Sequence, residues 1–179
     1  MLALMLLHHA RRRSRTRPDG RIGPLADQER SQWDTGLIAD GIDIAQAALA
    51  RDQFGKYQAQ AAIAAFHADA PRVEETDWVQ IVEWYNEPLR FADTPIVRLN
   101  RAVAVGEADA APAGLTSLAE VDEPVPRREA VAASLHQESG DLELAARLYA
   151  NAARGLPNLA ERDHQTRLAA RLIQKLHHR

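Results

Sequence analysis

The sequence predicts an all-α protein in which antiparallel helix hairpins are stacked side by side, with about nine helices in total. Two observations predict this fold class. Apolar residues recur at helical spacing along nearly the whole chain, and no stretch has the alternating β-branched pattern of a strand. Short turns rich in glycine, proline or aspartate separate the helical segments, which is typical of neighbouring antiparallel helices.

The first part of the chain is expected to contain four helices. A short apolar helix is followed by a loop over residues 14–26, in which proline and glycine recur. Asp27 is placed to cap the second helix, and we expect a neighbouring helix to approach closely at Gly36 and Gly41. The third helix is rich in alanine, which also permits close packing. The expected helices are 2–13, 27–50, 56–71 and 76–90.

Five further helical segments follow. Pro95 has a favoured first-turn position in the first of them, and Gly106 stands near its end. Gly155 and Pro157 end the fourth segment. The expected segments are 94–109, 112–120, 126–139, 141–157 and 158–179.

A set of small, aromatic and proline residues late in the chain has the spacing of the second half of a tetratricopeptide repeat (TPR), in which small residues permit helix contact and proline ends the unit. These residues are Gly140, Ala145, Tyr149, Ala152 and Pro157. The first half of the repeat is poorer, because Glu129 and His136 stand where aromatic residues are expected. The expected arrangement is therefore a TPR-like, right-handed array.

The composition excludes several classes of function. A chain of 179 residues with 46% hydrophobic residues can bury a sizeable core. The absence of cysteine excludes disulfides, thiolate metal sites and cysteine nucleophiles. The apolar run near the N-terminus precedes arginines, the reverse of a secretory signal, and it is too short to cross a bilayer. We therefore expect a cytoplasmic protein with no membrane partner.

Arginines cluster near the N-terminus. Residues 1–21 contain six arginines and one acidic residue, Asp19, although the net charge of the chain is −3. Such asymmetry is compatible with nucleic-acid binding. The segment lacks interleaved aromatic residues and contains Pro18 and Gly20, so we interpret it as a solvated loop and expect no direct DNA binding.

The segment TDWVQIVEWYNEPLR, residues 76–90, begins with a helix-start signal. Asp77 and Gln80 have the spacing of a capping box, in which each side chain bonds a free backbone N–H at the start of the helix. Pro88 is expected to bend or end this helix early.

The same segment concentrates aromatic residues. One helical face carries Trp78, Ile81, Tyr85 and Leu89. We interpret this face as a core seam with two polar groups, the indole N–H and the phenol, rather than as a ligand pocket. Trp84 points to another face and is a candidate anchor for a protein partner.

Two polar residues, Asn100 and Arg101, interrupt the apolar segment PIVRLNRAVAV. A buried asparagine needs hydrogen bonds, which a helix end or the region of Asp77 would supply. The alternative is that both residues line a groove and clamp a peptide.

The sequence contains no recognisable catalytic or metal-binding motif. The seven histidines form no metal-ligand pattern, and there is no phosphate-binding loop, dinucleotide fingerprint or nucleophile elbow. We therefore expect a protein that is not an enzyme, with no catalytic residue, metal or cofactor.

Five separated segments together resemble the C-terminal extension of a group of bacterial extracytoplasmic-function (ECF) RNA polymerase sigma factors, which carry a TPR-like domain after their two sigma domains. The segments are LALMLLHHARR, LADQERSQWD, YQAQAAIAAFHADA, TDWVQIVEWY and PIVRLNRAVAV. The resemblance implies that upstream domains bind core polymerase and read the promoter. It also implies that a set of positions belongs to a shared structural or binding feature: Asp77, Trp78, Gln80, Ile81, Tyr85, Asn100 and Arg101.

On this basis we expect residues 1–26 to form a helix and basic loop that join the sigma domains, and residues 27–179 to form the TPR-like domain. The leading hypothesis is a regulatory module that binds the sigma domains of its own chain, core polymerase or another protein in a concave groove. A free-standing peptide-binding scaffold is the second hypothesis. A small-molecule sensor, with its pocket between the alanine-rich helix and the Trp78 helix, is the third.

Overall fold

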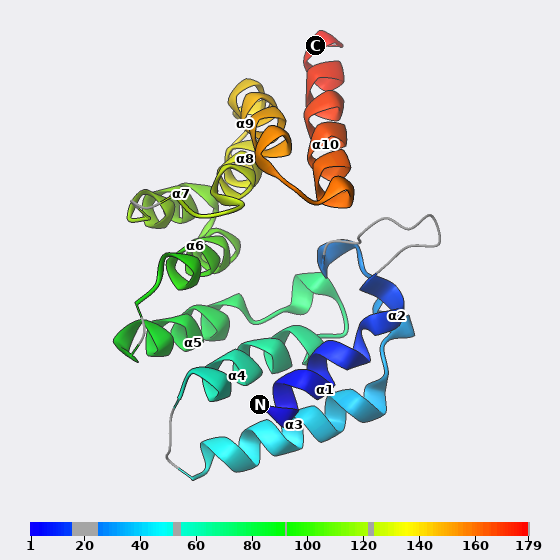
Figure 1. The fold of residues 1–179 in the computed structure, drawn as a ribbon, viewed down its shortest axis with the longest axis vertical. Coiled ribbons are helices and arrows are strands. Elements are labelled where there is room, and N and C mark those ends of the chain that lie inside the picture. Colours follow the sequence, from blue (N-terminus) through cyan, green and yellow to red (C-terminus); the bar gives the residue numbers. More distant parts are fainter. Residues whose placement is uncertain (16–24, 52–54, 92, 122–123, 179) are drawn as a thin grey trace. The chain divides into compact units, whose positions relative to one another are not determined.

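The computed structural model describes residues 1–15, 25–51, 55–91, 93–121 and 124–178, and the side chains of residues 88 and 91 are not described. These residues form ten α-helices and no strand, which confirms the all-α prediction of helix hairpins (Figure 1). The helices are α1 (Leu2–Ala10), α2 (Arg12–Arg15), α3 (Thr35–Leu49), α4 (Lys56–Asp69), α5 (Trp78–Phe91), α6 (Pro95–Asp109), α7 (Ala111–Ala119), α8 (Arg128–Glu138), α9 (Leu142–Gly155) and α10 (Leu159–His177). Short 3₁₀ helices lie at Leu25–Asp27, Arg30–Gln32 and Val73–Glu75. No described helix is both long and apolar enough to span a membrane.

The chain divides into two compact units, Met1–Asp93 and Thr94–Arg179. This division does not coincide with the boundary expected at residue 26, because α1 packs against α3 and α4 within the first unit. Most of the predicted basic loop, including Pro18 and Gly20, lies outside the described residues.

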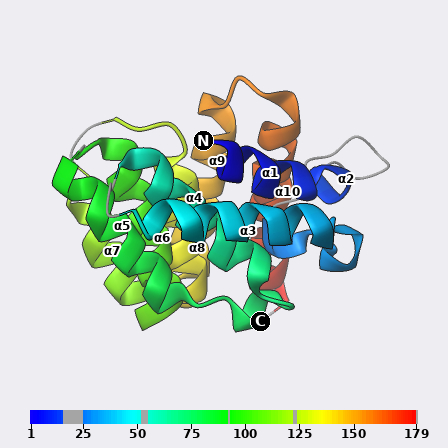
Figure 2. The same ribbon diagram turned by 90° about the horizontal axis from the view of Figure 1, so that it is seen from below.

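In the first unit, α1, α3 and α4 pack against one another, and α5 packs against α4. Figure 2 shows α1 beside α3. Leu7 is almost fully buried against Gly41, where an added Cβ would lie 2.8 Å from the Leu7 Cγ atom and 3.4 Å from the Ala3 carbonyl oxygen. The predicted close approach is therefore confirmed at Gly41. It is wrong at Gly36, which is exposed in the first turn of α3.

One predicted helix boundary in this unit is wrong. Helix α3 begins at Thr35 rather than near Asp27, since the Asp34 carboxylate accepts a hydrogen bond from the Leu37 N–H at 3.0 Å and caps the helix. Helix α5 ends at Phe91, close to the expected end at residue 90, so it continues past Pro88 and does not end early there. A proline deep in a helix removes one backbone hydrogen bond but does not always stop the helix.

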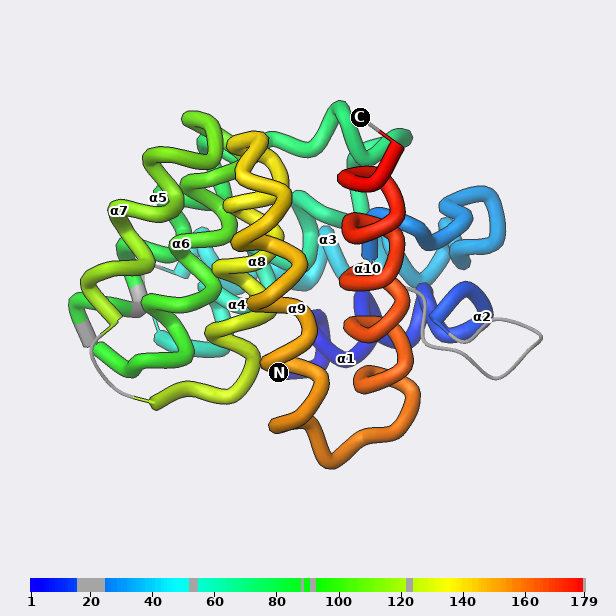
Figure 3. The backbone as a smooth tube through the Cα atoms, turned by 90° about the horizontal axis from the view of Figure 1, so that it is seen from above, coloured from blue at the N-terminus to red at the C-terminus, as the bar shows by residue number. Residues whose placement is uncertain are grey.

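The second unit is a row of hairpins, in which α6 packs on α7, α8 on α9, and α9 on α10 (Figure 3). Gly106 and Gly114 bring α6 and α7 together, because a Cβ on Gly114 would lie only 2.8 Å from the Gly106 Cα atom. The turn between α8 and α9 uses Gly140, whose φ of 86° favours glycine, and Asp141, which caps α9.

The TPR-like spacing corresponds to the inner face of the α8–α9 hairpin. The small and aromatic positions of the pattern are buried: Ala145 is 0%, Tyr149 4% and Ala152 6% exposed. Pro157 follows the end of α9. The pattern therefore indicated the buried face of this hairpin correctly.

Candidate functional site

The Asp77 half of the predicted capping box is present at the start of α5, and the described residues show no return hydrogen bond from the Gln80 side chain. The Asp77 carboxylate accepts a hydrogen bond from the Gln80 N–H at 3.0 Å, which satisfies one free donor at the start of the helix. The side chains of Asp77 and Gln80 are both exposed. Asp77 therefore stabilises the start of the helix with its side chain, whereas Gln80 contributes only its backbone N–H. Neither residue lines one of the two hollows described below.

Replacing Asp77 with alanine is expected to lower the free energy of unfolding by about 1 kcal/mol, because the capping hydrogen bond is lost. Gln80→Ala is the matched control, since it keeps the backbone N–H and removes only an exposed side chain. Urea unfolding followed by circular dichroism measures both variants. Equal losses in the two variants would contradict the assignment of the cap to Asp77.

The aromatic face of α5 is a packing seam. Ile81 is 0% exposed. Trp78 makes an edge-to-face contact with His67 of α4, with ring centroids 5.0 Å apart and an interplanar angle of 75°. Burial raises the pKa of Tyr85 to about 12, so its phenol stays protonated at physiological pH. Helix α5 packs against α4, and Trp78 contributes to this contact through His67.

Trp84 faces a different part of the first unit, as expected. It lines a hollow of about 240 Å³ together with side chains of α3 and α4, among them Ala45, Leu49 and Phe66. Trp84 is half-buried, so part of its ring stays accessible. Among the residues singled out in the sequence, Trp84 has a position suited to contact with a partner.

Asn100 and Arg101 belong to the second unit. Asn100 is exposed, so the prediction of a buried, hydrogen-bonded asparagine is wrong. Arg101 is half-buried and donates a hydrogen bond to the Ser117 hydroxyl at 3.1 Å. This contact joins α6 to α7, so the structure gives Arg101 an internal partner.

A cluster around Trp33 was not predicted from the sequence. The Arg30 guanidinium lies over the Trp33 ring, 4.6 Å from its centroid, in a cation–π contact. Its Nη1 atom donates to the carbonyl oxygens of His67 and Ala70, both at 2.6 Å, at the C-terminal end of α4. The indole N–H of Trp33 donates to the Ser14 hydroxyl at 2.8 Å. The cluster therefore fastens the segment before α3 to the end of α4.

His67 is the strongly perturbed histidine of this cluster. Burial, followed by the charges of Arg11 and Arg30, lowers its pKa to about 4. Its Nδ1 atom is buried and has no hydrogen-bond partner among the described residues. The imidazole is therefore neutral at physiological pH and packs as an aromatic ring.

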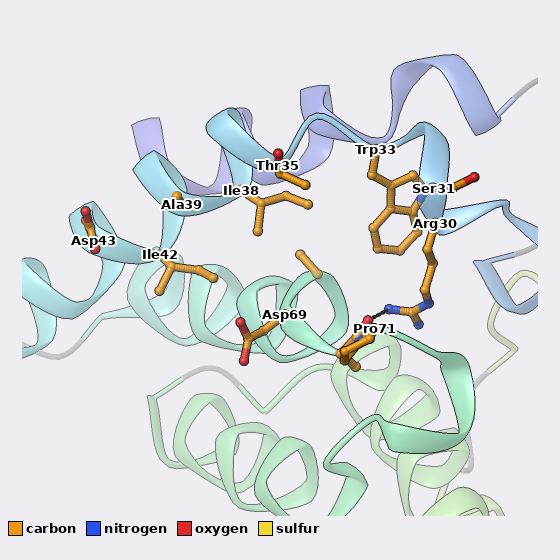
Figure 4. Close-up of a pocket in the computed structure, with 12 residues that line it drawn as sticks. Arg30, Ser31, Trp33, Thr35, Ile38, Ala39, Ile42, Asp43, Asp69 and Pro71 are labelled. Atoms are coloured by element: carbon orange, nitrogen blue, oxygen red, sulfur yellow. Dashed lines mark hydrogen bonds between the residues drawn. The ribbon is translucent and has the colours of Figure 1, made fainter.

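A larger hollow of about 650 Å³ lies between α3 and α4 (Figure 4). Ile38 and Ile42 form its wall on α3, Asp69 lies on α4, and Arg30 and Trp33 close one end. The larger hollow shares Ile42 and Asp69 with the hollow at Trp84. We refer to the two hollows together as the α3–α4 groove.

The α3–α4 groove has apolar walls and an acidic rim. Asp43 and Asp69 are its exposed carboxylates, and Arg30 is already bonded to the end of α4. Within the described part of the chain, no group of histidine and carboxylate side chains is arranged to hold a metal ion. The arrangement suits binding of an apolar surface that carries positive charge.

Comparison with known proteins gives two similarities. Residues 1–49, which contain α1, α2 and α3, match a family of unknown function (DUF6596). Over 115 residues, 64% of this chain, the sequence is 41% identical to an uncharacterised protein of Rhizobium meliloti (strain 1021), and this match spans 27% of that protein. No solved structure matches the chain significantly.

Proposed function

We propose that this chain is the protein-binding C-terminal domain of an ECF sigma factor and that it regulates transcription initiation by bacterial RNA polymerase. The α3–α4 groove is the observation that carries the proposal. It is an open surface of aliphatic and small side chains, bordered by carboxylates, on a pair of packed helices. Grooves of this kind bind apolar faces of other polypeptides.

Two further observations support the sigma-factor context. Five segments of the sequence resemble the TPR-like extension of this group, and four of them lie wholly or mainly in the first unit, where the groove lies. Most of the Rhizobium relative lies outside the matched part, as expected if the chain corresponds to one domain of a longer protein. The proposed partners are the sigma domains of the same polypeptide and core polymerase, in the cytoplasm.

Regulation requires the groove to bind its partner with different affinity in the promoter-competent and idle states of the sigma factor. A partner with equal affinity for both states does not change the equilibrium between them. The role of this domain is therefore binding, without a catalytic residue or cofactor of its own.

In the full-length protein, Trp84→Ala is expected to change transcription from the target promoter by about fivefold or more, because Trp84 lines the groove. Val79→Ala is the control, since Val79 is 60% exposed on the same helix and lines neither hollow. In vitro transcription with purified core polymerase measures both. Unchanged output from folded Trp84→Ala protein would count against the proposal, as would the absence of in-frame sigma regions before Met1 in the gene.

A small-molecule sensor is the second candidate, because the hollow at Trp84 is the place where the alanine-rich helix, α5 and α3 meet. At about 240 Å³ this hollow is smaller than the roughly 300–1,000 Å³ typical of ligand pockets. The size of the hollow favours the side chain of a polypeptide over a whole small molecule. A free-standing scaffold would use the same groove without polymerase.

A further inference from the structure

The α3–α4 groove has the length of a short helix. Its apolar wall on α3 runs from Ile38 through Ile42 to Leu49, a rise of about 16 Å at the helical spacing of 1.5 Å per residue. The facing wall on α4 contains the small residues Ala62 and Ala65, which leave depth for an inserted side chain. Side chains at positions i, i+4 and i+7 of a three-turn helix would reach both hollows.

Another face of the same helix pair already holds a helix. Helix α1 packs against both α3 and α4, and it buries Ala3, Leu7 and Ala10, which have the spacing i, i+4 and i+7. No residue of α1 lines either hollow of the groove. The packing of α1 therefore shows that this helix pair accepts a third helix through small and aliphatic side chains.

The charged residues at the rim of the groove indicate which charge a bound segment should carry. Asp43 on α3 and Asp69 on α4 are both exposed, and neither forms an ion pair or hydrogen bond within the described residues. The cation at the end of the groove, Arg30, is held by two carbonyl oxygens and by the Trp33 ring. Two free carboxylates beside an apolar floor are complementary to lysine or arginine next to aliphatic anchors.

We propose that the α3–α4 groove binds a basic amphipathic helix of a protein partner, with aliphatic side chains in the two hollows and lysine or arginine opposite Asp43 and Asp69. This inference rests on the proposed function only in that the groove binds a polypeptide. It adds the secondary structure and the charge of the bound segment.

The test uses the whole chain and a fluorescent 14-residue peptide with leucines at i, i+4 and i+7 and lysines elsewhere. A second peptide carries glutamate in place of every lysine. Fluorescence anisotropy is expected to show binding of the basic peptide, with affinity about tenfold lower for the double variant Asp43→Lys/Asp69→Lys. Asp40→Lys is the matched control, because Asp40 is an exposed aspartate of α3 that lines neither hollow.

Five results would overturn the proposal. Three of them are equal affinity of the wild type and the double variant for the basic peptide, equal binding of the acidic peptide, and no binding of the basic peptide at millimolar concentration. A fourth is a dimer of the chain that the double variant dissociates, because the groove would then hold a second copy. An equal loss of affinity in Asp40→Lys would place the binding outside the groove and would also overturn it.

The same variants separate this inference from the proposed function. If the peptide binds as expected but the double variant leaves promoter output unchanged in the full-length protein, the sigma-factor role fails and the chemistry of the groove stands. If Trp84→Ala changes promoter output but the basic peptide does not bind, the groove chemistry fails and the regulatory role stands.

Discussion

Acidification is expected to remove about 2–3 kcal/mol of folding stability through His67 alone. Its pKa is about 4 in the folded protein and 6.5 in the absence of tertiary contacts. Between these values the unfolded chain binds a proton that the folded protein excludes, so stability falls as the pH falls from about 6.5 to 4 and is unaffected above about 7.5. The full difference in pKa corresponds to about 3 kcal/mol, and the slight exposure of the ring reduces it.

His67→Phe provides the reference for this prediction. Phenylalanine retains an aromatic ring against Trp78 and has no titratable group, so its stability should decline less over the same pH range. Urea unfolding of both proteins at pH 7.5, 6 and 4.5 gives the difference directly. If the two proteins lose stability in parallel, His67 is not buried in its neutral form and the cluster around Arg30 is wrongly placed.

Gly114→Ala is expected to destabilise the second unit by about 1–3 kcal/mol, even though alanine favours helix formation. The new Cβ would lie 2.8 Å from the Gly106 Cα atom and 3.0 Å from the Ala102 carbonyl oxygen, so α6 and α7 must move apart. A clash with backbone atoms cannot be relieved by a change of side-chain rotamer. Hydrogen exchange of α6 and α7 amides measures the loss locally, which is useful because two compact units need not unfold together.

Alanine substitutions at two other glycines provide a comparison for the Gly114→Ala variant. At Gly106 the new Cβ would clash with the Leu135 Cδ2 atom but would lie 3.7 Å from the Gly114 Cα atom, so rotation of the Leu135 side chain relieves most of the conflict. At Gly155 nothing lies within 4 Å. We expect destabilisation to decrease in the order Gly114→Ala, Gly106→Ala, Gly155→Ala, with the last near zero or stabilising. A Gly114→Ala protein as stable as the wild type would show that α6 and α7 are not in backbone contact.

Local patterns predicted the helices and the buried faces well. The small and aromatic spacing of Ala145, Tyr149 and Ala152 indicated the inner face of α9, and the sequence position of Asp77 indicated a helix cap. These signals succeed because helix periodicity and capping depend on neighbours within a few residues.

The error at Asn100 came from the phase of one helix. The buried stripe of α6 runs through Leu99, Ala102 and Gly106, at spacings of three and four residues, which turns Asn100 towards solvent. An apolar helix with few polar residues leaves its buried side ambiguous until its neighbours are known.

The groove and its end were not predictable from local sequence. Arg30 bonds carbonyl groups that are 37 and 40 residues away in the chain, and no spacing rule connects such positions. The two hollows exist because α3 and α4 pair, and neither helix alone indicates a binding surface. The sequence shows that Trp84 lies off the helical face of Trp78 and Tyr85. It does not show which residues of α3 and α4 surround Trp84.

Photocrosslinking from α3 tests most directly whether the α3–α4 groove holds another polypeptide. A photoreactive amino acid is introduced at Ala39, an exposed residue that lines the groove, or at Ala47, an exposed residue of the same helix that lines neither hollow. In the full-length protein with core polymerase, we predict that position 39 crosslinks to a basic helical segment of the sigma domains or the polymerase and that position 47 does not. Equal crosslinking from both positions, or none from position 39 in a transcriptionally active complex, would contradict binding in the groove.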